Sequence, residues 1–397
     1  MKNVLILGGD GYLGWPTAMF FSSKGYKVAL VDNYLRRKIC RNLNITLLYD
    51  VPNLLDRVKI WYELTGFEIK VAIGDMRDAE FVRSLFNGKI KYDWIKSFNR
   101  IKIEVPDIVI HFAEMPSAPY SMMNYDTSNF TISNNLLSTN NLMYAIKDYS
   151  KETHIIKIGT MGEYGTPDID IEEGWIEIEH KGRKDKFIYP RQANSIYHTT
   201  KIMDTDLLWF GVRMWNLKVT DLMQGPVYGI ETEESRINEK LSTLFNYDEV
   251  FGTVINRFII QAVYGYPLTV YGAGGQTRGY INIKDVLQCI YVSSLNPPNA
   301  GELRIFNQFT ETFTVKEIAE KVSSVANKLG YNCTIKSINN PRIELEHHYY
   351  NVIHKGLLEL GIKPNYLTSE IIHDIFKIVE KYKNNIREDL IFSGIKW

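Results

Sequence analysis

The chain has 397 residues, 45% of them hydrophobic and 23% charged, which is typical of a globular protein and predicts either two packed units or one large α/β domain with an appendage. Its 46 basic and 46 acidic residues give a formal net charge of zero, which favours neither nucleic acid nor an anionic membrane as a partner. The three cysteines, Cys40, Cys289 and Cys333, form no CxxC or Cys/His pattern, which argues against a disulfide framework or a zinc site and for a reducing cytosol. No apolar run approaches the ~20 residues of a membrane span, so we interpret the apolar N-terminal run as a buried strand.

Short apolar runs alternate with helical stretches through the first half of the chain. The predicted strands are 3–8, 27–32, 69–75, 107–113, 154–159 and 217–222, and the predicted helices are 13–24, 78–86, 130–149 and 197–214. The runs are continuously apolar, which is typical of strands buried on both faces of a parallel sheet. This order predicts an α/β fold, a doubly wound parallel-sheet Rossmann domain.

A glycine pattern follows the first predicted strand directly. "GGDGYLG" places Gly8, Gly11 and Gly14 at three-residue intervals. The first glycine allows a tight turn, the second lets the backbone approach a pyrophosphate, and the third lets the next helix pack on the sheet. The helix N-terminus adds unpaired N–H groups for the phosphates. This context predicts a dinucleotide site.

The end of the second predicted strand indicates which dinucleotide is bound. Asp32 suits the ribose hydroxyls and repels a 2′-phosphate, which favours NAD, whereas Arg36 and Arg37 would suit that phosphate; we side with Asp32. Asp75 either contacts the adenine edge or is a polar residue that closes a strand. The predicted cofactor-binding residues are Gly8, Gly11, Tyr12, Gly14, Asp32, Asn33, Arg36, Arg37, Asp75, Met76, Phe112, Ala113, Tyr197 and Lys201.

Two further motifs carry acid–base chemistry. "TMGEYG" places Thr160 and Glu163 after the strand 154–159, and "SIYHTTK" places Tyr197 and Lys201 one helical turn apart on one face. A tyrosine is a poor base at neutral pH, but a lysine ammonium and a nicotinamide cation nearby would both favour its phenolate. The hydroxyl of Thr160 would share the substrate proton.

The predicted division into units has two insertions. Residues 33–66 carry helical spacing, and residues 166–190 read as a hairpin that is either a lid over a site or a surface ornament. We expect an NAD-binding Rossmann domain at 1–224 plus about 271–297. A smaller mixed α/β nucleotide-sugar-binding domain would comprise 225–270 plus about 298–397, with an amphipathic helix at 314–330.

This order of glycine loop, threonine and Tyr-x-x-x-Lys resembles the extended short-chain dehydrogenase/reductase family from residue 3 to about 360. The resemblance implies a homodimer paired through the Tyr197 helix and its neighbour. The 4,6-dehydratases of that family have Thr-Asp-Glu where this chain has Thr160, Met161 and Gly162, and the epimerases have small hydroxyl residues there.

Longer strings are similar to the UDP-sulfoquinovose synthase family. They are "TMGEYGTPDIDIEEG", "HFAEMPSAPYSM", "YGAGGQTRGYINIKD", "FNQFTETF" and "NPRIELEHHYYN". The resemblance implies that UDP-glucose and sulfite are joined with NAD recycled in each turnover. Tyr197 would take the C4 hydroxyl proton during hydride transfer, water would leave across C5–C6, sulfite would add at C6, and C4 would be reduced again.

The same resemblance suggests roles for neighbouring residues. Glu163 is our candidate for the C5 base or the C6 acid, with a capping or salt-bridge role as the alternative. His198 would bond the C6 hydroxyl, unless it is simply packed. Pro116 stands where the family has an arginine, which leaves the contact that recruits sulfite open.

The predicted substrate-binding residues are Thr160, Gln224, Tyr228, Arg278 and Arg342, with the two arginines facing the diphosphate. His347 and His348 are adjacent and point apart on any regular element, so we expect no metal.

Three alternatives remain at this stage. A UDP-sugar 4-epimerase or 4,6-dehydratase would form product without sulfite, and a non-catalytic NAD-binding regulator would bind NAD without turnover. Because no chloroplast-type transit segment is recognisable, we expect a cytoplasmic protein, and the product's fate in sulfolipid or glycan synthesis stays open.

Overall fold

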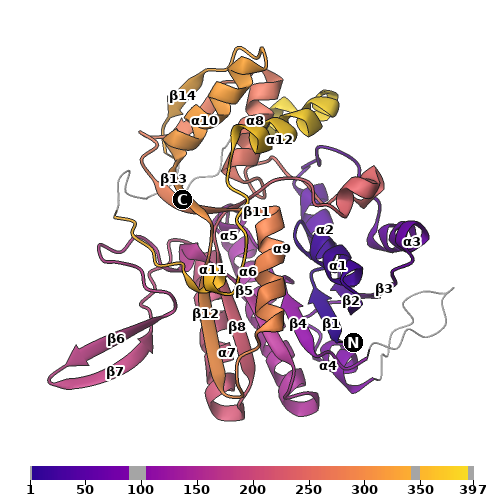
Figure 1. Cartoon of the computed structure of the whole chain (residues 1–397), viewed down its shortest axis with the longest axis vertical. Helices are drawn as coiled ribbons and strands as arrows, with labels where there is room; N and C mark the ends of the chain where they lie inside the picture. Colours follow the sequence, from indigo (N-terminus) through magenta and orange to yellow (C-terminus); the bar gives the residue numbers. More distant parts are fainter. Residues whose placement is uncertain (1, 89–103, 341–348, 392–397) are drawn as a thin grey trace.

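A seven-stranded sheet runs through the centre of the computed structural model, which describes residues 2–88, 104–340 and 349–391 (Figure 1). The strand order is β12-β8-β5-β4-β1-β2-β3, and every neighbouring pair is parallel. The strands are β1 (Asn3–Leu7), β2 (Lys27–Asp32), β3 (Ile69–Ile73), β4 (Ile108–His111), β5 (His154–Thr160), β8 (Lys218–Gln224) and β12 (Glu302–Gln308). The six strands predicted from apolar runs all lie in this sheet, which confirms the doubly wound architecture.

Helices cover both faces of the sheet (Figure 1). One face carries α1 (Gly14–Ser23), α3 (Leu54–Thr65) and α9 (Ile283–Leu295), and the other carries α4 (Ala79–Asn87), α6 (Tyr125–Tyr149) and α7 (Ile196–Trp215). Helix α6 begins five residues before the predicted start at residue 130. Asn124 and Thr127 form a capping box that begins the helix ahead of its apolar face.

The two predicted insertions fold as separate elements. Residues 33–66 contain α2 (Leu35–Asn42) and α3, and residues 166–190 contain the hairpin of β6 (Trp175–His180) and β7 (Arg183–Ile188). The hairpin projects from the body of the molecule in Figure 1. Its strands pair Glu177 with Lys186 and Glu179 with Lys184, so one of its faces is charged.

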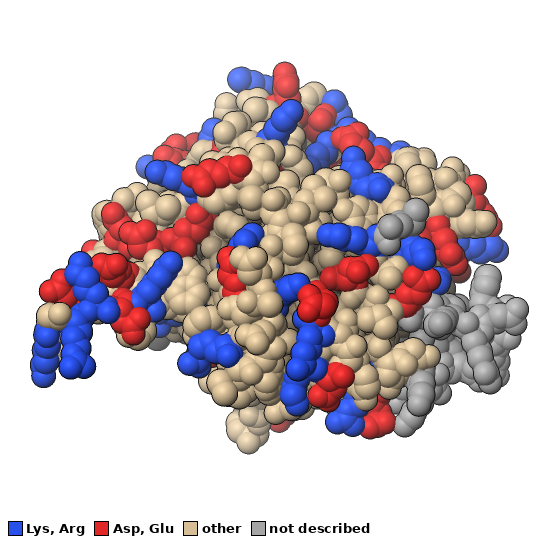
Figure 2. Space-filling model, turned by 60° about the horizontal axis from the view of Figure 1, so that its bottom comes forward, with Lys and Arg blue, Asp and Glu red and all other residues tan. Residues whose placement is uncertain are grey.

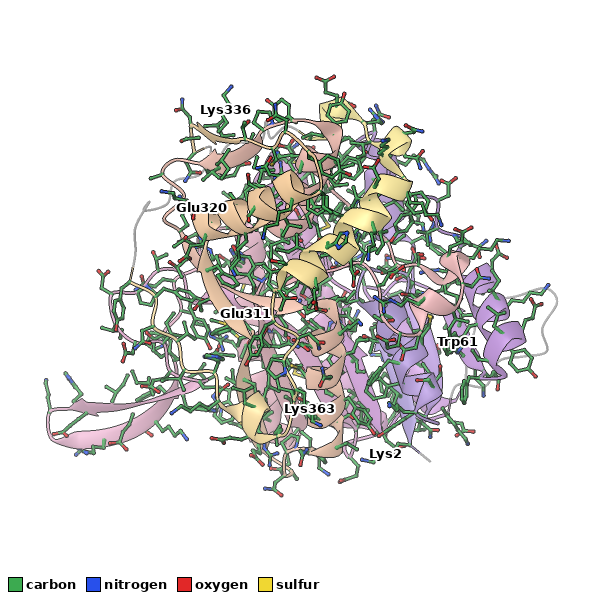
Figure 3. The ribbon with its side chains drawn as sticks, turned by 45° about the horizontal axis from the view of Figure 1, so that its top comes forward. Lys2, Trp61, Glu311, Glu320, Lys336 and Lys363 are labelled. Atoms are coloured by element: carbon green, nitrogen blue, oxygen red, sulfur yellow. The ribbon has the colours of Figure 1, made fainter. Side chains whose placement is uncertain are left out.

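The smaller part of the molecule stands over the carboxyl ends of the sheet strands and has its own apolar core. Its elements are α8 (Val254–Tyr264), α10 (Val315–Lys328), α12 (Ser369–Lys381), α13 (Glu388–Ile391), β10 (Leu268–Tyr271) and β14 (Ile335–Ile338). In Figure 3, Lys336 and Glu320 lie in this part, far from Lys2 at the opposite end of the molecule. Glu311 lies between the smaller part and the end that carries Lys2 (Figure 3). Its carboxylate accepts a hydrogen bond from the backbone N–H of Leu367.

The predicted boundary at residue 298 does not match the sheet. Strand β12 pairs with β8 as an edge strand of the large sheet, so residues 302–308 belong there. A three-stranded sheet of β9 (Val227–Tyr228), β11 (Thr277–Asn282) and β13 (Glu311–Thr314) joins the two parts. Short helices α5 (Ala118–Ser121) and α11 (Gly356–Glu359) complete the set of α-helices in the described ranges.

Positive and negative side chains are interspersed over the face shown in Figure 2, in keeping with the zero net charge. Within the described ranges, none of the helices combines the length and the apolar character needed to cross a bilayer.

Candidate active site

A cleft of about 490 Å³ lies at the carboxyl ends of the central strands. It is lined by the glycine loop after β1, the loops after β4 and β5, the start of α7, and residues from α8 and β11. Strand order reverses between β1 and β4, and ligands of doubly wound sheets bind at such a switch point.

The glycine loop is shaped by close backbone contacts. Gly8 has φ of 86°, and a Cβ there would come within 2.8 Å of the Phe112 backbone. A Cβ on Gly14 would lie 2.0 Å from the carbonyl oxygen of Gly8, so the start of α1 packs directly against the loop. The loop therefore presents bare backbone and a helix N-terminus to the cleft, which fits a pyrophosphate.

Asp32 closes this end of the cleft. Its carboxylate accepts hydrogen bonds from the backbone N–H of Asp10 (2.8 Å) and of Tyr34 (2.6 Å). Burial raises the pKa of Asp32 to about 6, with Asp10 adding to the shift. Carboxylate oxygens have further lone pairs, so Asp32 also has capacity for ribose hydroxyls.

The neighbouring arginines have other partners. Arg37 forms a bidentate pair with Asp10 (2.6 and 2.9 Å) and does not line the cleft, which differs from its predicted cofactor role. Arg36 lines the cleft, but its guanidinium bonds Asn246 and lies over the Phe251 ring. Both guanidinium groups thus already have protein partners, which agrees with NAD.

Asp75 and Met76, two of the predicted cofactor-binding residues, also line the cleft. Burial opposes ionisation of Asp75, but Arg77 outweighs it and lowers the pKa of this carboxyl. The Asn33 side-chain amide donates a hydrogen bond to the Asp75 carboxylate, with 3.3 Å between Nδ2 and Oδ2. The other predicted cofactor residues Gly11, Tyr12, Phe112 and Ala113 also line the cleft.

The "TMGEYG" turn presents its threonine to the cleft and its glutamate to the interior. Thr160 lines the cleft at the end of β5, and its Oγ1 accepts a hydrogen bond from the N–H of Gly162 (3.2 Å). Glu163 is fully buried, does not line the cleft, and accepts from the N–H of Thr160 (3.1 Å). The structure thus places Glu163 in the capping and salt-bridge role, and we withdraw it as a candidate C5 base.

Glu163 belongs to a buried network of four charges. Its carboxylate lies 2.9 Å from Arg191 and 3.4 Å from Lys157, and Lys157 lies 3.1 Å from Asp221. Burial opposes ionisation of Asp221, but Lys157 and Arg191 outweigh it and lower its pKa. Lys157 also donates to the carbonyl of Lys201 at 3.1 Å, so the network ties the turn to α7.

Helix α7 begins at the site because Ser195 caps it, with its Oγ accepting from the N–H of His198 (3.2 Å). Tyr197 and His198 in the first turn both line the cleft, and their rings lie 5.1 Å apart. A Cβ on Gly162 would lie 2.3 Å from His198 Nε2, so the imidazole packs against the "TMGEYG" turn.

Tyr197 and Lys201 share the cleft, but the ammonium has another partner. Lys201 Nζ contacts the carboxylate of Glu114, and both side chains are almost fully buried. Burial raises the pKa of Tyr197, and Glu114 and Glu163 raise it further. Burial disfavours the ammonium of Lys201, but Glu114 and Asp204 outweigh it, so the pKa of this lysine is raised.

Glu114 is a residue of the cleft for which no role was predicted from the sequence. The available signal was its position in "HFAEMPS", directly after β4 at the carboxyl edge of the sheet, where ligands of this fold bind. Nothing in the spacing indicated that it would reach a lysine 87 residues later.

The predicted substrate residues separate in the structure. Gln224 and Arg278 line the cleft, and Oε1 of Gln224 is buried with no hydrogen-bond partner among the described residues. Tyr228 does not line it: the ring is buried and its hydroxyl donates to the carbonyl of Asn365, which corrects that prediction. Arg342 lies outside the described residues.

Two further predictions concern a metal and a lid over the site. The described residues hold no cluster of acidic, histidine or cysteine side chains suited to a metal, while His347 and His348 lie outside them. The hairpin of β6 and β7 contributes no residue to the described cleft lining. Pro116 lines the cleft and offers an anion no charge there.

Comparisons with known proteins agree with this geometry. The model of the "NAD dependent epimerase/dehydratase family" matches residues 4–307. The chain is 44% identical over 396 residues to a chloroplastic UDP-sulfoquinovose synthase of Spinacia oleracea, covering all of this chain and 79% of the spinach protein. It is 41% identical over 398 residues to the UDP-sulfoquinovose synthase of Sulfolobus acidocaldarius, covering 97% of that protein.

Solved structures share the fold. A UDP-glucose 4-epimerase from Bifidobacterium longum, in complex with NAD+ and UDP, has a TM-score of 0.67 at 20% identity and covers 98% of this chain and all of its own. A UDP-glucuronic acid 4-epimerase from Bacillus cereus, in complex with UDP-glucuronic acid and NAD, has a TM-score of 0.66 at 17% identity over 96% of this chain and 99% of its own. From the family match and the full-length identity to two synthases, this chain belongs to the NAD dependent epimerase/dehydratase family and, within it, to the UDP-sulfoquinovose synthases.

Proposed function

We propose that this chain converts UDP-glucose and sulfite into UDP-sulfoquinovose and water, with NAD as its cofactor. The observation that carries the proposal is the sequence identity of 44% and 41%, over the whole of this chain, to two UDP-sulfoquinovose synthases. The cleft agrees with it, because Thr160, Tyr197 and Lys201 line it beside a dinucleotide loop. Bound NAD would supply a hydride acceptor for the sugar C4 at the start of the cycle and a hydride donor at its end.

Tyr197 is our proposed base for the C4 hydroxyl proton, and the Thr160 hydroxyl would share that proton. The resulting C4 carbonyl acidifies the C5–H bond, so a base in the cleft can take the C5 proton while the C6 hydroxyl is protonated and leaves as water. Sulfite sulfur then adds to C6 and the base returns its proton to C5. Hydride returns to C4 as Tyr197 returns its proton to the C4 oxygen. The balance is one UDP-glucose and one hydrogensulfite in, and one UDP-sulfoquinovose and one water out.

His198 is our proposed proton donor to the leaving C6 hydroxyl. It lines the cleft one position after Tyr197, and its Nδ1 lies 3.0 Å from Ser195 Oγ, which fixes the ring plane. Replacement of His198 by asparagine should slow elimination while C4 oxidation persists. Enzyme-bound NADH would therefore accumulate on addition of UDP-glucose, as an absorbance increase near 340 nm.

We propose that Arg278 and Gln224 bind the nucleotide sugar. Arg278 would pair with the diphosphate, and the buried Oε1 of Gln224 would accept a sugar hydroxyl. Replacing Arg278 with methionine should raise KM for UDP-glucose more than it lowers kcat.

The deciding experiment is mass spectrometry of purified protein incubated with UDP-glucose, with and without sulfite. A product with sulfonate in place of hydroxyl, formed only with sulfite, supports the proposal. A sulfite-independent UDP-hexose isomer or 4-keto-6-deoxy product would replace it with the epimerase or dehydratase alternative.

We also propose a homodimer formed through α6 and α7. These helices pack on each other and expose apolar side chains, which are Ile132, Leu137, Tyr144, Met203, Phe210 and Met214. A second copy would cover them with the same two helices in a four-helix arrangement. The double change Leu137→Glu and Phe210→Glu should halve the mass measured by light scattering.

A cytoplasmic location is our further proposal, supported by Cys40, Cys289 and Cys333, which are all free and buried. Titration of the denatured protein with a thiol reagent should find three thiols without prior reduction.

A further inference from the structure

Helix α3 of the insertion 33–66 carries an arginine that reaches the glycine loop from outside the cleft. Arg57 is fully buried, and one of its terminal nitrogens lies 2.5 Å from Asp10 Oδ1 in the loop after β1. Its guanidinium also lies over the Trp15 ring, 4.7 Å from the ring centroid, and donates to the carbonyl of Ser242 at 3.4 Å. Burial lowers the pKa of Arg57 to about 10, so this arginine is charged at neutral pH. The insertion therefore fixes a positive charge against the cofactor loop.

Asp10 connects this charge to Asp32. The backbone N–H of Asp10 donates to the Asp32 carboxylate (2.8 Å), and the Asp10 carboxylate accepts from both Arg37 and Arg57. The side chain of Arg37 is 24% exposed, so water screens its charge more than that of Arg57, which is 0% exposed. Loss of Arg57 would therefore leave the Asp10 carboxylate, next to Asp32, with only its more screened partner.

Other charged groups at this end of the cleft have partners of their own. The Arg36 guanidinium donates to a side-chain amide oxygen at 2.7 Å, and the Asp75 carboxylate pairs with the arginine two residues on, also at 2.7 Å. Burial raises the pKa of Asp32 to about 6, with the Asp10 carboxylate adding to the shift and Arg57 opposing it. The titratable and charged groups around Asp32 are Asp10 after β1, Tyr34, Arg36 and Arg37 at the start of α2, Arg57 on α3, and Asp75 and Arg77 after β3.

We propose that Arg57 is a positioning residue for the cofactor, which acts through Asp10 to hold the glycine loop in place and to balance the charge beside Asp32. The insertion 33–66 is then part of the NAD site, although α3 contributes no residue to the described lining of the cleft. A charged Asp32 can accept hydrogen bonds from ribose hydroxyls with both oxygens, whereas a protonated carboxyl keeps one oxygen as a donor. Arg57 therefore matters for NAD binding without touching NAD.

The test is the pH dependence of NAD binding to the purified full-length holoenzyme. Dialysis against a fixed NAD concentration between about pH 5 and about pH 8, followed by acid extraction, gives the Kd for NAD at each pH. The midpoint of this profile should lie near pH 6 in the unaltered chain, with Asp32→Asn as the blank. In Arg57→Met the midpoint should rise by at least about one pH unit. If only the ionised form binds, the Kd at pH 6 then rises about fivefold.

Two variants separate this effect from a general loss of structure. Arg57→Lys keeps the positive charge, so its midpoint should stay within about 0.5 pH units of the unaltered chain. Asp10→Asn removes the negative member of the same pair, so its midpoint should fall by at least about 0.5 pH units. A pair with a structural role alone would instead weaken NAD binding equally at every pH in both Asp10→Asn and Arg57→Met.

Lys59→Met is the matched control on the same helix. Lys59 is 72% exposed and lies 3.8 Å from Glu63, so the same change of charge is screened by water and should leave the midpoint within about 0.3 pH units.

The proposal is overturned by an unmoved midpoint in Arg57→Met, by shifts of the same sign in Arg57→Met and Asp10→Asn, or by an equal shift in Lys59→Met. If Arg57→Met does not fold, Asp10→Asn decides, since an unmoved or raised midpoint in that variant also overturns the proposal. The measurement contains neither sugar nor sulfite, so its outcome is independent of whether the sulfite reaction itself is confirmed.

Discussion

Loss of the Glu163 carboxylate should leave Arg191 and Lys157 with an excess of buried positive charge. Glu163, Arg191, Lys157 and Asp221 are each at most 4% exposed and sum to zero charge. Glu163→Gln leaves one uncompensated buried positive charge, and removing one partner of a buried pair costs about 3–5 kcal/mol. We expect the free energy of unfolding to fall by about 3 kcal/mol, at the lower end of this range, because the glutamine oxygen still accepts a hydrogen bond from the Thr160 N–H.

Calorimetry or dye-monitored melting measures this loss. Unfolding entropy of about 2.1 cal/mol/K per residue implies about 1.2 °C per kcal/mol for a chain of this length, so the melting temperature should fall by about 4 °C. Arg191→Met restores neutrality when combined with Glu163→Gln. The double variant should therefore be at least about 1 kcal/mol more stable than the sum of the single changes predicts.

Activity separates the two roles of Glu163. With a structural role, folded Glu163→Gln keeps kcat within about tenfold, because Thr160 keeps its place in the turn. A variant with an unchanged melting temperature, no coupling to Arg191 and a kcat reduced by about 10²-fold or more would mean that Glu163 is the proton carrier after all.

Three further outcomes follow from the structure. Gly14→Ala puts a Cβ 2.0 Å from the Gly8 carbonyl oxygen, which should displace the glycine loop. The purified variant should therefore contain little NAD, measured by the absorbance of its acid extract, and full NAD occupancy would contradict the packing argument. Asp32 ionises with a pKa of about 6, so the Kd for NAD should rise as the pH falls through 6 by calorimetric titration, and Asp32→Asn should flatten the profile. Burial lowers the pKa of His111 and of His154 to about 3, whereas in the unfolded chain their pKa is near 6.5. The unfolded chain therefore binds more protons below pH 6.5, so the free energy of unfolding falls as the pH falls, by up to about 1.4 kcal/mol per pH unit for each histidine. Urea midpoints should show this loss, and His154→Gln should reduce it by about half; a midpoint independent of pH between 7 and 5 would contradict it.

The sequence by itself determined the parallel sheet and the cofactor loop. Both depend on local signals: continuous apolar runs bury a strand on two faces, and glycine spacing sets a backbone path that side chains would block. The shared face of Tyr197 and Lys201 could also be predicted from the sequence, because residues four apart lie on the same face of a helix. The order of these parts along the chain then fixed which edge of the sheet they share.

Tertiary structure alone decided which charged groups meet. Glu163 and Thr160 are three residues apart, yet one turns inward to Lys157 and the other outward to the cleft. Glu114 reaches Lys201 from a different strand, and Arg37 turns to Asp10 instead of the cofactor. Such pairings depend on distances between elements far apart in the chain and on the high cost of leaving a charge unpaired in a dry interior, and neither quantity is encoded in local spacing.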